Sequence, residues 1–183
     1  QGKAISGTFV RLDKPGREVW LEASYMPVLD EQRQVTSVIK VAADISQRVV
    51  QEHESENLLK AISRSMAVIE FTPQGRVIKA NQNFLDTMGY RLDEVVGRHH
   101  GLFCLAHERE SVEYREFWAS LNRGEYHSHR FERIDKQGRM VNLEASYNPI
   151  FDSKGRLNKV VKFASDITRQ VCTQQNAADA AHA

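Results

Sequence analysis

Alternating apolar and polar residues predict a run of strands in the C-terminal half of the chain. Every second residue is apolar over 140–150, a period of two that is typical of a half-buried strand. Strand-like stretches flank it at 126–134 and 157–165, and turns that contain Gly138 and Gly155 separate the three. Turns this short join antiparallel neighbours, so we expect an antiparallel meander.

The region before this meander predicts a hairpin followed by helices. Residues 68–72 and 76–80 are strand-like and flank a turn at Gly75. Apolar residues then recur at helical spacing in three stretches, and a glycine ends each of them. These stretches are residues 81–90, 91–96 and 114–122. The predicted order of elements is therefore β-β-α-α-α-β-β-β.

The chain contains one sequence pattern twice. Residues 9–49 reappear without a gap as residues 131–171, about 122 positions later, and roughly half of the aligned positions are identical. The second copy follows a hairpin and helices over 67–130 that have no counterpart before the first copy. We therefore expect the second half of a first module over 1–45 and a complete second module over 67–171.

Helical patterns follow both copies. Residues 46–66 predict one connector helix, with Ser46 at a typical N-cap position and an irregular apolar stripe in a charged background. Three strands without covering helices are marginally stable. We therefore expect either that the first half of this module is missing from the segment, or that a homodimer shelters residues 1–45 with a partner's sheet or the connector helix. The stripe on the connector also favours pairing between helices.

Composition and charge narrow the possible partners. The chain has 183 residues and a net charge of +1, without a basic stripe of interleaved aromatic residues, so we expect no nucleic-acid binding. No stretch approaches the ~18 consecutive apolar residues that span a membrane, so we expect no direct membrane contact in this segment. Cys104 and Cys172 lack metal or redox spacing, which suggests a reducing, cytoplasmic compartment. A membrane tether elsewhere in a longer parent protein stays open.

Several motifs in the second module resemble the PAS sensor family. In chain order they are Asn81-x-x-Phe84, Met88-Gly89-Tyr90, Asp93-Glu94, Gly97, Lys136-Gln-Gly138, Tyr147-Asn-Pro149, Gly155 and Asp166-Ile-Thr168. The resemblance covers nearly all of residues 67–171, and residues 9–50 resemble the second half alone. It implies an α+β PAS fold, with a five-stranded antiparallel sheet, helices on one face of the sheet and a signalling helix between domains.

In detail, the chain most resembles the tandem PAS modules of bacterial methyl-accepting chemotaxis transducers, including those linked to biofilm dispersion and to aerotaxis. This resemblance implies a sensory signal-transduction module in a homodimer, with residues 172–183 leading toward a downstream helical signalling domain. The competing interpretation is a protein-interaction module without a ligand. No nucleophile–base arrangement, paired catalytic acids or glycine-rich phosphate loop can be located, so we expect no enzyme activity.

Histidines supply the first candidates for a ligand site. His99 and His100, then Cys104 and His107, lie in the segment that flanks the pocket of PAS folds. Imidazole can ligate haem iron through one nitrogen while an acceptor holds the other, and His100 is the predicted haem ligand. Adjacent helical residues point to different faces, so only one of the two neighbouring histidines could face inward.

Flavin is the rival cofactor, and a packed pocket without a cofactor is the third possibility. The aerotaxis resemblance implies flavin, but the chain departs from that family's pattern at residues 104–108. It also has His99-His100-Gly101-Leu102 where blue-light sensors carry their reactive cysteine. Trp118 could stack on a planar ligand or pack in the core. Asn81 and Asn142 could hydrogen-bond a ligand, although an asparagine at position 81 more often caps the helix that follows.

The junctions between each repeat and its following helix are the clearest functional feature. They are Asp44-Ile-Ser46 and Asp166-Ile-Thr168. The hydroxyl could cap the helix, and the aspartate could pair with a nearby arginine or with free helix N–H groups. A shift in the sheet would then bias the helix, so we expect Asp44, Ser46, Asp166 and Thr168 to relay the signal. An ordinary helix cap is the simpler interpretation.

Overall fold

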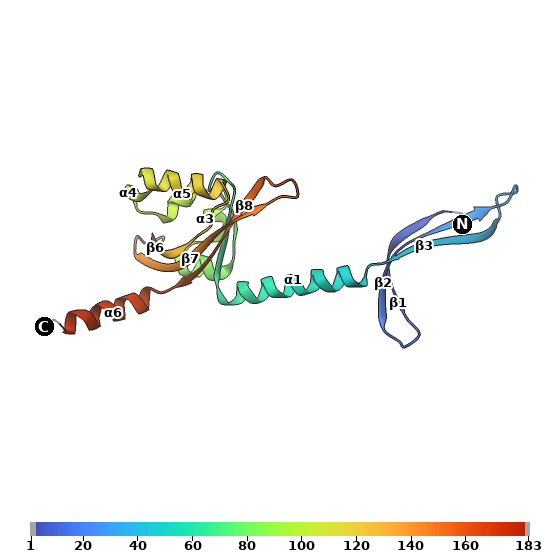
Figure 1. The fold of residues 1–183 in the computed structure, drawn as a ribbon, viewed down its shortest axis with the longest axis horizontal. Coiled ribbons are helices and arrows are strands. Elements are labelled where there is room, and N and C mark those ends of the chain that lie inside the picture. Colours follow the sequence, from blue (N-terminus) through green and yellow to red (C-terminus); the bar gives the residue numbers. More distant parts are fainter. Residues whose placement is uncertain (1–2, 182–183) are drawn as a thin grey trace. The chain divides into compact units, whose positions relative to one another are not determined.

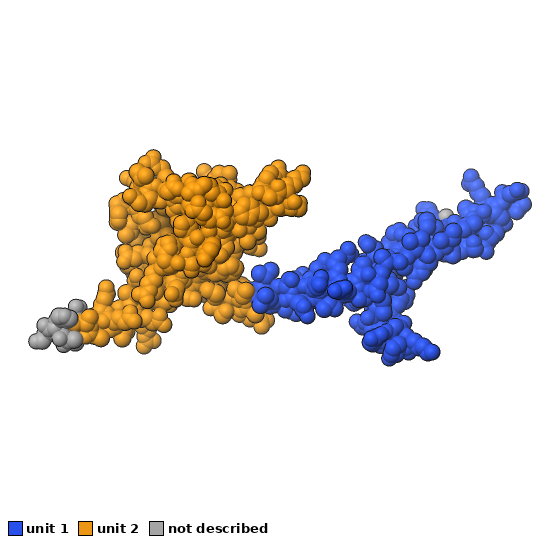
Figure 2. All heavy atoms as spheres, in the orientation of Figure 1, with its two compact units in different colours: residues 1–60 blue, residues 61–183 orange. Residues whose placement is uncertain are grey.

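The computed structural model describes residues 3–181, and the chain forms two compact units, Gln1–Lys60 and Ala61–Ala183 (Figure 2). The first unit contains three strands, which are β1 (Ile5–Leu12), β2 (Glu18–Leu29) and β3 (Val35–Asp44). They pair side by side in the order β1-β2-β3, and both pairings are antiparallel. The meander predicted for the first copy is therefore confirmed.

Helix α1 (Ser46–Ser65) follows β3, close to the extent predicted for a connector helix. None of its residues is buried, and the apolar side chains of Val50, Leu58 and Leu59 stay more than half exposed. Its stability therefore depends on its own backbone and surface rather than on packing. No helix in the described part of the chain is long and apolar enough to cross a membrane.

The second unit contains a five-stranded antiparallel sheet in the order β5-β4-β8-β7-β6 (Figure 1). Its strands are β4 (Ala67–Phe71), β5 (Val77–Ala80), β6 (His127–Ile134), β7 (Met140–Phe151) and β8 (Leu157–Asp166). The predicted hairpin and the predicted meander join where β4 pairs with β8, with Ile69 opposite Lys162. One continuous layer results.

The helices of the second unit lie between β5 and β6 in the chain, and one more follows β8. They are α2 (Gln82–Met88), α3 (Leu92–Val95), the 3₁₀ helix η1 (His100–Phe103), α4 (Ala106–Arg109), α5 (Val112–Asn122) and α6 (Thr168–Ala181). The three predicted helices are confirmed to within two residues at each end. The four-residue elements η1 and α4 were not predicted, because they are too short to show a helical period and no glycine marks their end as Gly97 does for the equally short α3.

Short polar side chains and a glycine fix the ends of these helices. Asn81 Oδ1 accepts the Phe84 N–H at 3.0 Å and begins α2. Ser111 Oγ accepts the Tyr114 N–H at 3.0 Å and begins α5. Gly89 ends α2 in the left-handed region, with a φ of 71°, where residues with a side chain are strained.

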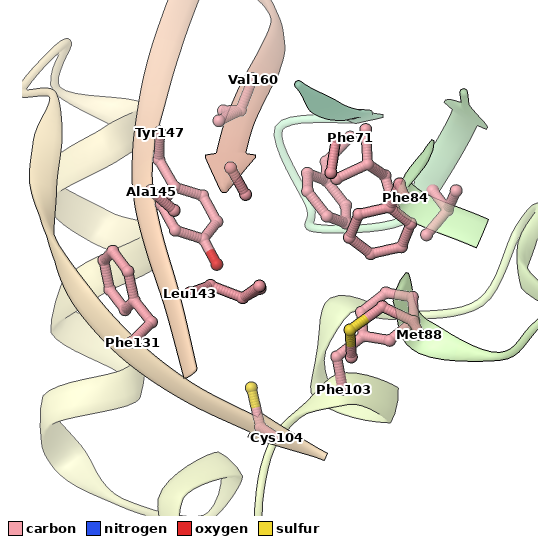
Figure 3. Packing of buried hydrophobic residues seen from close by; sticks show 14 of the residues in the cluster. Phe71, Phe84, Met88, Phe103, Cys104, Phe131, Leu143, Ala145, Tyr147 and Val160 are labelled. Carbon is pink, nitrogen blue, oxygen red and sulfur yellow. The ribbon is translucent and has the colours of Figure 1, made fainter. Parts of the chain in front are cut away.

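One hydrophobic core lies between the helices and one face of the five-stranded sheet. Leu143, Ala145 and Tyr147 alternate along β7 with outward-facing residues and are at most 4% exposed. Figure 3 shows these side chains directed toward the same interior as Phe71 of β4 and Phe84 of α2. The predicted α+β architecture, with its helices on one face of the sheet, is therefore confirmed.

Candidate functional site

A polar cluster lies inside this core and is centred on His100 at the start of η1. The side chain is fully buried. Its Nδ1 lies 2.8 Å from the Tyr114 hydroxyl, and its Nε2 lies 2.9 Å from the Tyr147 hydroxyl. A neutral imidazole has one donor and one acceptor nitrogen, so one tyrosine accepts from it and the other donates to it. Burial lowers the pKa of His100 well below its ordinary value, which keeps the ring neutral.

Two cationic side chains extend from the sheet into the same interior. Arg133 on β6 and Lys162 on β8 are each 2% exposed. Arg133 Nη2 lies 3.4 Å from the Tyr147 hydroxyl, a long hydrogen bond. Lys162 Nζ lies 4.8 Å from the centre of the Tyr147 ring, in cation–π geometry. Tyr147 therefore connects both cations to His100.

The cluster holds more positive than negative groups. Glu108 on α4 accepts from Arg133 at 2.9 Å and is the one carboxylate within ion-pair distance of either cation among residues 3–181. Burial, and then the charge of Arg133, lower the pKa of Lys162 well below its ordinary value. Burial raises the pKa of Tyr147 to about 12, so its hydroxyl stays protonated. Within the part of the chain that the structure describes, Lys162 therefore has no carboxylate at ion-pair distance to stabilise its charged form.

Two buried donors of the cluster lack an acceptor within the part of the chain that the structure describes. They are the indole Nε1 of Trp118 and the Nε of Arg133. Leaving a buried donor unsatisfied costs about 1–3 kcal/mol. Each donor therefore marks a place where an acceptor from outside the chain would be stabilising.

A cleft of about 400 Å³ opens beside Arg133, between α4, α5 and β6. Its apolar surface comes from the aromatic rings of Tyr114, Phe117 and Phe131. The other charged residues that line it are Glu108, Glu113, Arg130 and Glu132. This volume lies within the usual range of small-molecule sites.

The structure separates the four candidates in the segment after Gly97. His99 is exposed, and its Nδ1 accepts the Gly101 N–H at 3.1 Å, so it caps η1. His107 is exposed on α4. Cys104 is 1% exposed, and burial raises its pKa to about 11, which makes the thiol a small buried group rather than a reactive one. Of these histidines, His100 is the one in the interior, and Cys104 Sγ lies 3.6 Å from its Nδ1.

Trp118 lies in the interior but packs as a core aromatic residue. Its ring is 9% exposed and meets Phe71 and His100 edge-on, with ring centres 5.8 Å and 5.5 Å away. Its free indole N–H is the one feature that points to a ligand. Stacking on a planar group stays a prediction.

The two asparagines lie away from the interior cluster. Asn81 Oδ1 also accepts the Val68 N–H at 2.9 Å, and its Nδ2 donates to the Met66 carbonyl at 2.8 Å. This side chain thereby joins the end of α1 to β4 and α2. Asn142 lies on the face of β7 opposite to that of Leu143 and Tyr147. Their ligand-binding roles stay predictions.

The interior in this packing fits neither haem nor flavin. Both ring nitrogens of His100 are engaged by tyrosine hydroxyls, so neither is free for iron. Among residues 3–181, no group of three or more His, Cys, Asp or Glu side chains could hold a metal ion. A planar cofactor would have to displace close-packed rings such as Tyr147 and Trp118. The packing therefore gives no support to His100 as a haem ligand, which stays a prediction.

The junction after the second repeat ties its helix to β7 with two backbone groups. The Ile167 N–H donates to the Asn142 carbonyl at 2.9 Å. In return, the Asn142 N–H donates to Thr168 Oγ1 at 2.9 Å. The first turn of α6 is therefore bonded to a strand that also lines the core.

The first repeat reproduces this junction. The Ile45 N–H donates to the Trp20 carbonyl at 2.8 Å, and the Trp20 N–H donates to Ser46 Oγ at 2.9 Å. Trp20 and Asn142 occupy the same position of the repeat. The bonds use their backbone groups, so the junction tolerates the change of side chain.

In both junctions the aspartate, and not the hydroxyl, accepts from the start of the helix. Asp44 accepts the Ser46 N–H, and Asp166 accepts the Thr168 N–H, each at 2.9 Å. The aspartates therefore cap the helices, as one predicted alternative had it, while the hydroxyls face the sheet. Neither aspartate forms an ion pair with an arginine among the described residues. The predicted N-cap at Ser46 is wrong, because its hydroxyl is the acceptor for β2.

Sequence reasoning missed most of the interior cluster, although the repeat carried a signal. Four of the identical positions of the repeat supply side chains at one tyrosine of each copy: Phe9 and Phe131, Arg11 and Arg133, Tyr25 and Tyr147, and Lys40 and Lys162. In the first unit, an arginine Nη2 again lies 3.4 Å from the tyrosine hydroxyl, and a lysine Nζ lies 5.4 Å from the tyrosine ring. The same group of side chains is therefore built on both sheets.

Comparisons with known proteins agree with this fold. Residues 77–164 match the PAS fold, and residues 1–47 match the PAS domain. The chain is 47% identical over 182 residues to the biofilm dispersion protein BdlA of Pseudomonas aeruginosa, which covers 100% of this chain and 44% of that protein. It is 27% identical over 128 residues to the bacterioopsin transcriptional activator of Halobacterium salinarum, with 67% of this chain and 19% of that protein covered. The chain thus spans less than half the length of these relatives.

Solved structures are similar in fold. The PAS domain of a protein from Colwellia psychrerythraea has a TM-score of 0.54 at 19% identity, covering 62% of this chain and 97% of that chain. A light-oxygen-voltage domain has a TM-score of 0.53 at 18% identity, covering 69% and 96%. At such identities the likeness concerns the fold alone. The sheet order, the helices on one face and these matches agree, and the chain belongs to the PAS family.

Proposed function

We propose that this chain is a sensory signal-transduction module of a chemotaxis-type receptor, in which the PAS sheet relays the state of its interior to the helix α6. The observation that supports this proposal best is the junction at Thr168. β7 presents Tyr147 to the interior cluster and bonds the root of α6 through Asn142. A displacement of β7 therefore moves both the interior cluster and the first turn of α6.

The same contacts occur at Ser46, which suggests that both copies of the repeat relay a signal to the helix that follows. Both helices leave their sheets through a hydroxyl acceptor and an aspartate cap. We infer that residues 1–45 belong to a first PAS domain and residues 67–171 to a second, with α1 passing the signal between them. Residues 172–183 would lead toward a helical signalling domain in a homodimer.

A ligand-free interaction module is the second candidate. It is favoured by the close packing around His100, where both ring nitrogens already have partners. In that case the interior would be structural, and the sheet or α1 would dock a partner. PAS membership and the relationship to the biofilm dispersion protein BdlA favour a sensor without catalytic activity over an enzyme.

The test is the signalling output of a full receptor that carries this segment, reconstituted with its kinase. Thr168→Val removes the hydroxyl that accepts from Asn142, while Thr168→Ser keeps it, as Ser46 does in the first repeat. We expect the valine variant to change kinase output by about fivefold or more, since coupling energies are typically ~1–3 kcal/mol. The serine variant should behave like the unaltered receptor. Equal outputs from all three receptors would refute the relay.

A further inference from the structure

The inner face of the second sheet carries two basic side chains where apolar residues would be more stable. Arg133 and Lys162 are each 2% exposed, and the one carboxylate beside them, Glu108, is about one-third exposed. Burying charge without a full set of partners costs several kcal/mol, and apolar residues of similar volume are often more stable. Such an arrangement favours a function for the positive charge over a purely structural role.

The repeat supports the same conclusion independently. Arg11 and Lys40 flank Tyr25 in the first sheet as Arg133 and Lys162 flank Tyr147 in the second. About half of the repeat differs between the copies, yet this group is unchanged. The two copies thus keep a pair of cations at one tyrosine although their surroundings differ.

The guanidinium of Arg133 can be reached from outside the domain. The cleft between α4, α5 and β6 reaches Arg133, and its Nε has no acceptor within the described residues. Glu108 accepts from this guanidinium, with its Oε1 2.9 Å from Nη1. Glu108 therefore holds one donor that an incoming carboxylate would take, and the Nε of the same guanidinium still lacks an acceptor among the described residues.

We propose that this cleft binds a small organic monocarboxylate with an apolar or aromatic body, and that Arg133 is its principal contact. The ligand displaces Glu108 from Arg133, whose guanidinium supplies the positive charge. Monocarboxylates are thereby named as the class of ligand that the proposed sensor detects, and their role as a signal rests on the proposed function. Glu108 acts as an internal competitor that occupies the site in the ligand-free state.

The lining of the cleft sets the selectivity. Phe117, Phe131 and Tyr114 form an apolar surface suited to a hydrocarbon or aromatic body. Glu113 and Glu132 also line the cleft, and with Glu108 they outnumber its other cation, Arg130, so a second negative charge on the ligand is repelled. Monocarboxylates should therefore bind better than dicarboxylates or phosphate, although these carry more charge toward the arginine.

The test uses the 183-residue chain and the indole N–H signals of its two tryptophans in NMR spectra. The probe is benzoate, and the matched controls are benzamide, which is isosteric and neutral, and phthalate, which carries a second carboxylate. We expect benzoate to shift the Trp118 signal saturably and to leave the Trp20 signal in place. Benzamide and phthalate should shift neither. Equal shifts from benzamide, or none from benzoate, would overturn the proposal.

Three variants assign the contact. Arg133→Gln should weaken benzoate binding by about tenfold or more, because it removes a charged donor. Arg156→Gln, which removes an exposed arginine on the β7–β8 turn, should leave binding unchanged. Glu108→Gln should tighten binding by about fivefold, because the internal competitor loses its charge. This variant keeps the test decisive if Arg133→Gln fails to fold. Weaker binding in Glu108→Gln would refute the displacement.

The two proposals fail separately. Absence of benzoate binding would leave the output of the Thr168→Val receptor as an independent test of relay. The converse result is that benzoate binds while the Thr168→Val receptor keeps a normal kinase output. That result would support the ligand class and refute the relay.

Discussion

Lys162 is a buried lysine whose position destabilises the folded protein, and this suggests that it is kept for a function. It lies on β8 opposite Tyr147, almost fully buried, over the rings of Tyr147 and Phe84 at 4.8 Å and 6.0 Å. Burial and the Arg133 charge lower its pKa in the folded protein. In the unfolded chain the lysine binds its proton up to a pH of ~10.4. Folding at neutral pH therefore opposes protonation of this side chain.

Replacing Lys162 by Met should therefore stabilise the fold at pH 7, by about 1–3 kcal/mol. Because the unfolded state of the original chain binds more protons, its stability should rise as the pH increases from 7 toward ~10, and the variant should lose that slope. Urea unfolding at pH 7 and pH 9 measures both effects. Lys154→Met, at an exposed turn position, is the control and should keep the slope. Lower stability of the Lys162 variant at both pH values would contradict this interpretation.

At the scale of elements, tight turns decide where strands end and what they touch. Gly75 and Gly138 each sit in a hairpin turn with a φ of 77°. They differ in surroundings. A Cβ at Gly75 would lie 2.8 Å from His99 Nε2 and 3.0 Å from Trp118 Cζ2, whereas nothing lies within 4 Å of one at Gly138. The β4–β5 turn is thus packed against the helical side of the domain.

This difference predicts that a glycine-to-alanine substitution destabilises the protein more at position 75 than at position 138. Gly138→Ala should lower the free energy of unfolding by about 1–2 kcal/mol, which is the strain of a positive φ alone. Gly75→Ala should cost about 1–3 kcal/mol more, because His99 and Trp118 must move. Chemical denaturation of both variants measures the difference, and near-UV circular dichroism reports the Trp118 environment. Equal costs would show that the turn is not packed as described.

The elements that the sequence predicts well are those with a repeating pattern. The period of two over β7 and the glycines at the turns located the meander, because a strand buries every second side chain. The pattern gave no sign of η1 and α4, which are too short to show a period and have no glycine at their end. It also missed Arg133 and Lys162 as interior residues, because charge normally indicates exposure.

The junctions show a different limit of sequence reasoning. Asp-Ile-Ser and Asp-Ile-Thr identify a helix start, and both the aspartate and the hydroxyl are suitable caps. Their sequence does not state which group faces the neighbouring strand. That choice depends on how close β2 and β7 approach the helix, as in the 2.9 Å contacts of Ser46 and Thr168.

For the whole molecule, the duplication suggests a chain of two similar relays. Each sheet ends in a helix held by the same contacts, and α1 carries exposed apolar residues, Leu58 and Leu59 among them. An exposed apolar stripe on a helix is typical of a surface that pairs with another helix. The proposed homodimer would bury it.

Leu58→Glu should therefore shift the chain from dimer to monomer, because pairing would bury the new charge. Asn57→Glu adds the same charge at the neighbouring position and serves as the control. Sedimentation velocity at micromolar concentration measures the oligomeric state of both variants and of the unaltered chain. A monomeric unaltered chain, or equal effects of the two substitutions, would contradict pairing through the stripe.

The most direct test of the relay is a double-mutant cycle read by hydrogen exchange in the first turn of α6. Tyr147→Phe removes the hydroxyl that contacts His100 and Arg133 without changing the shape of the ring. In the unaltered chain and in Thr168→Ser, this change in the core should alter exchange in α6 by about fivefold, or ~1 kcal/mol. In Thr168→Val, the effect should disappear. Two results would contradict a sheet-to-helix relay. One is that Tyr147→Phe leaves hydrogen exchange in α6 unchanged, and the other is that it changes this exchange equally in the Thr168→Val background.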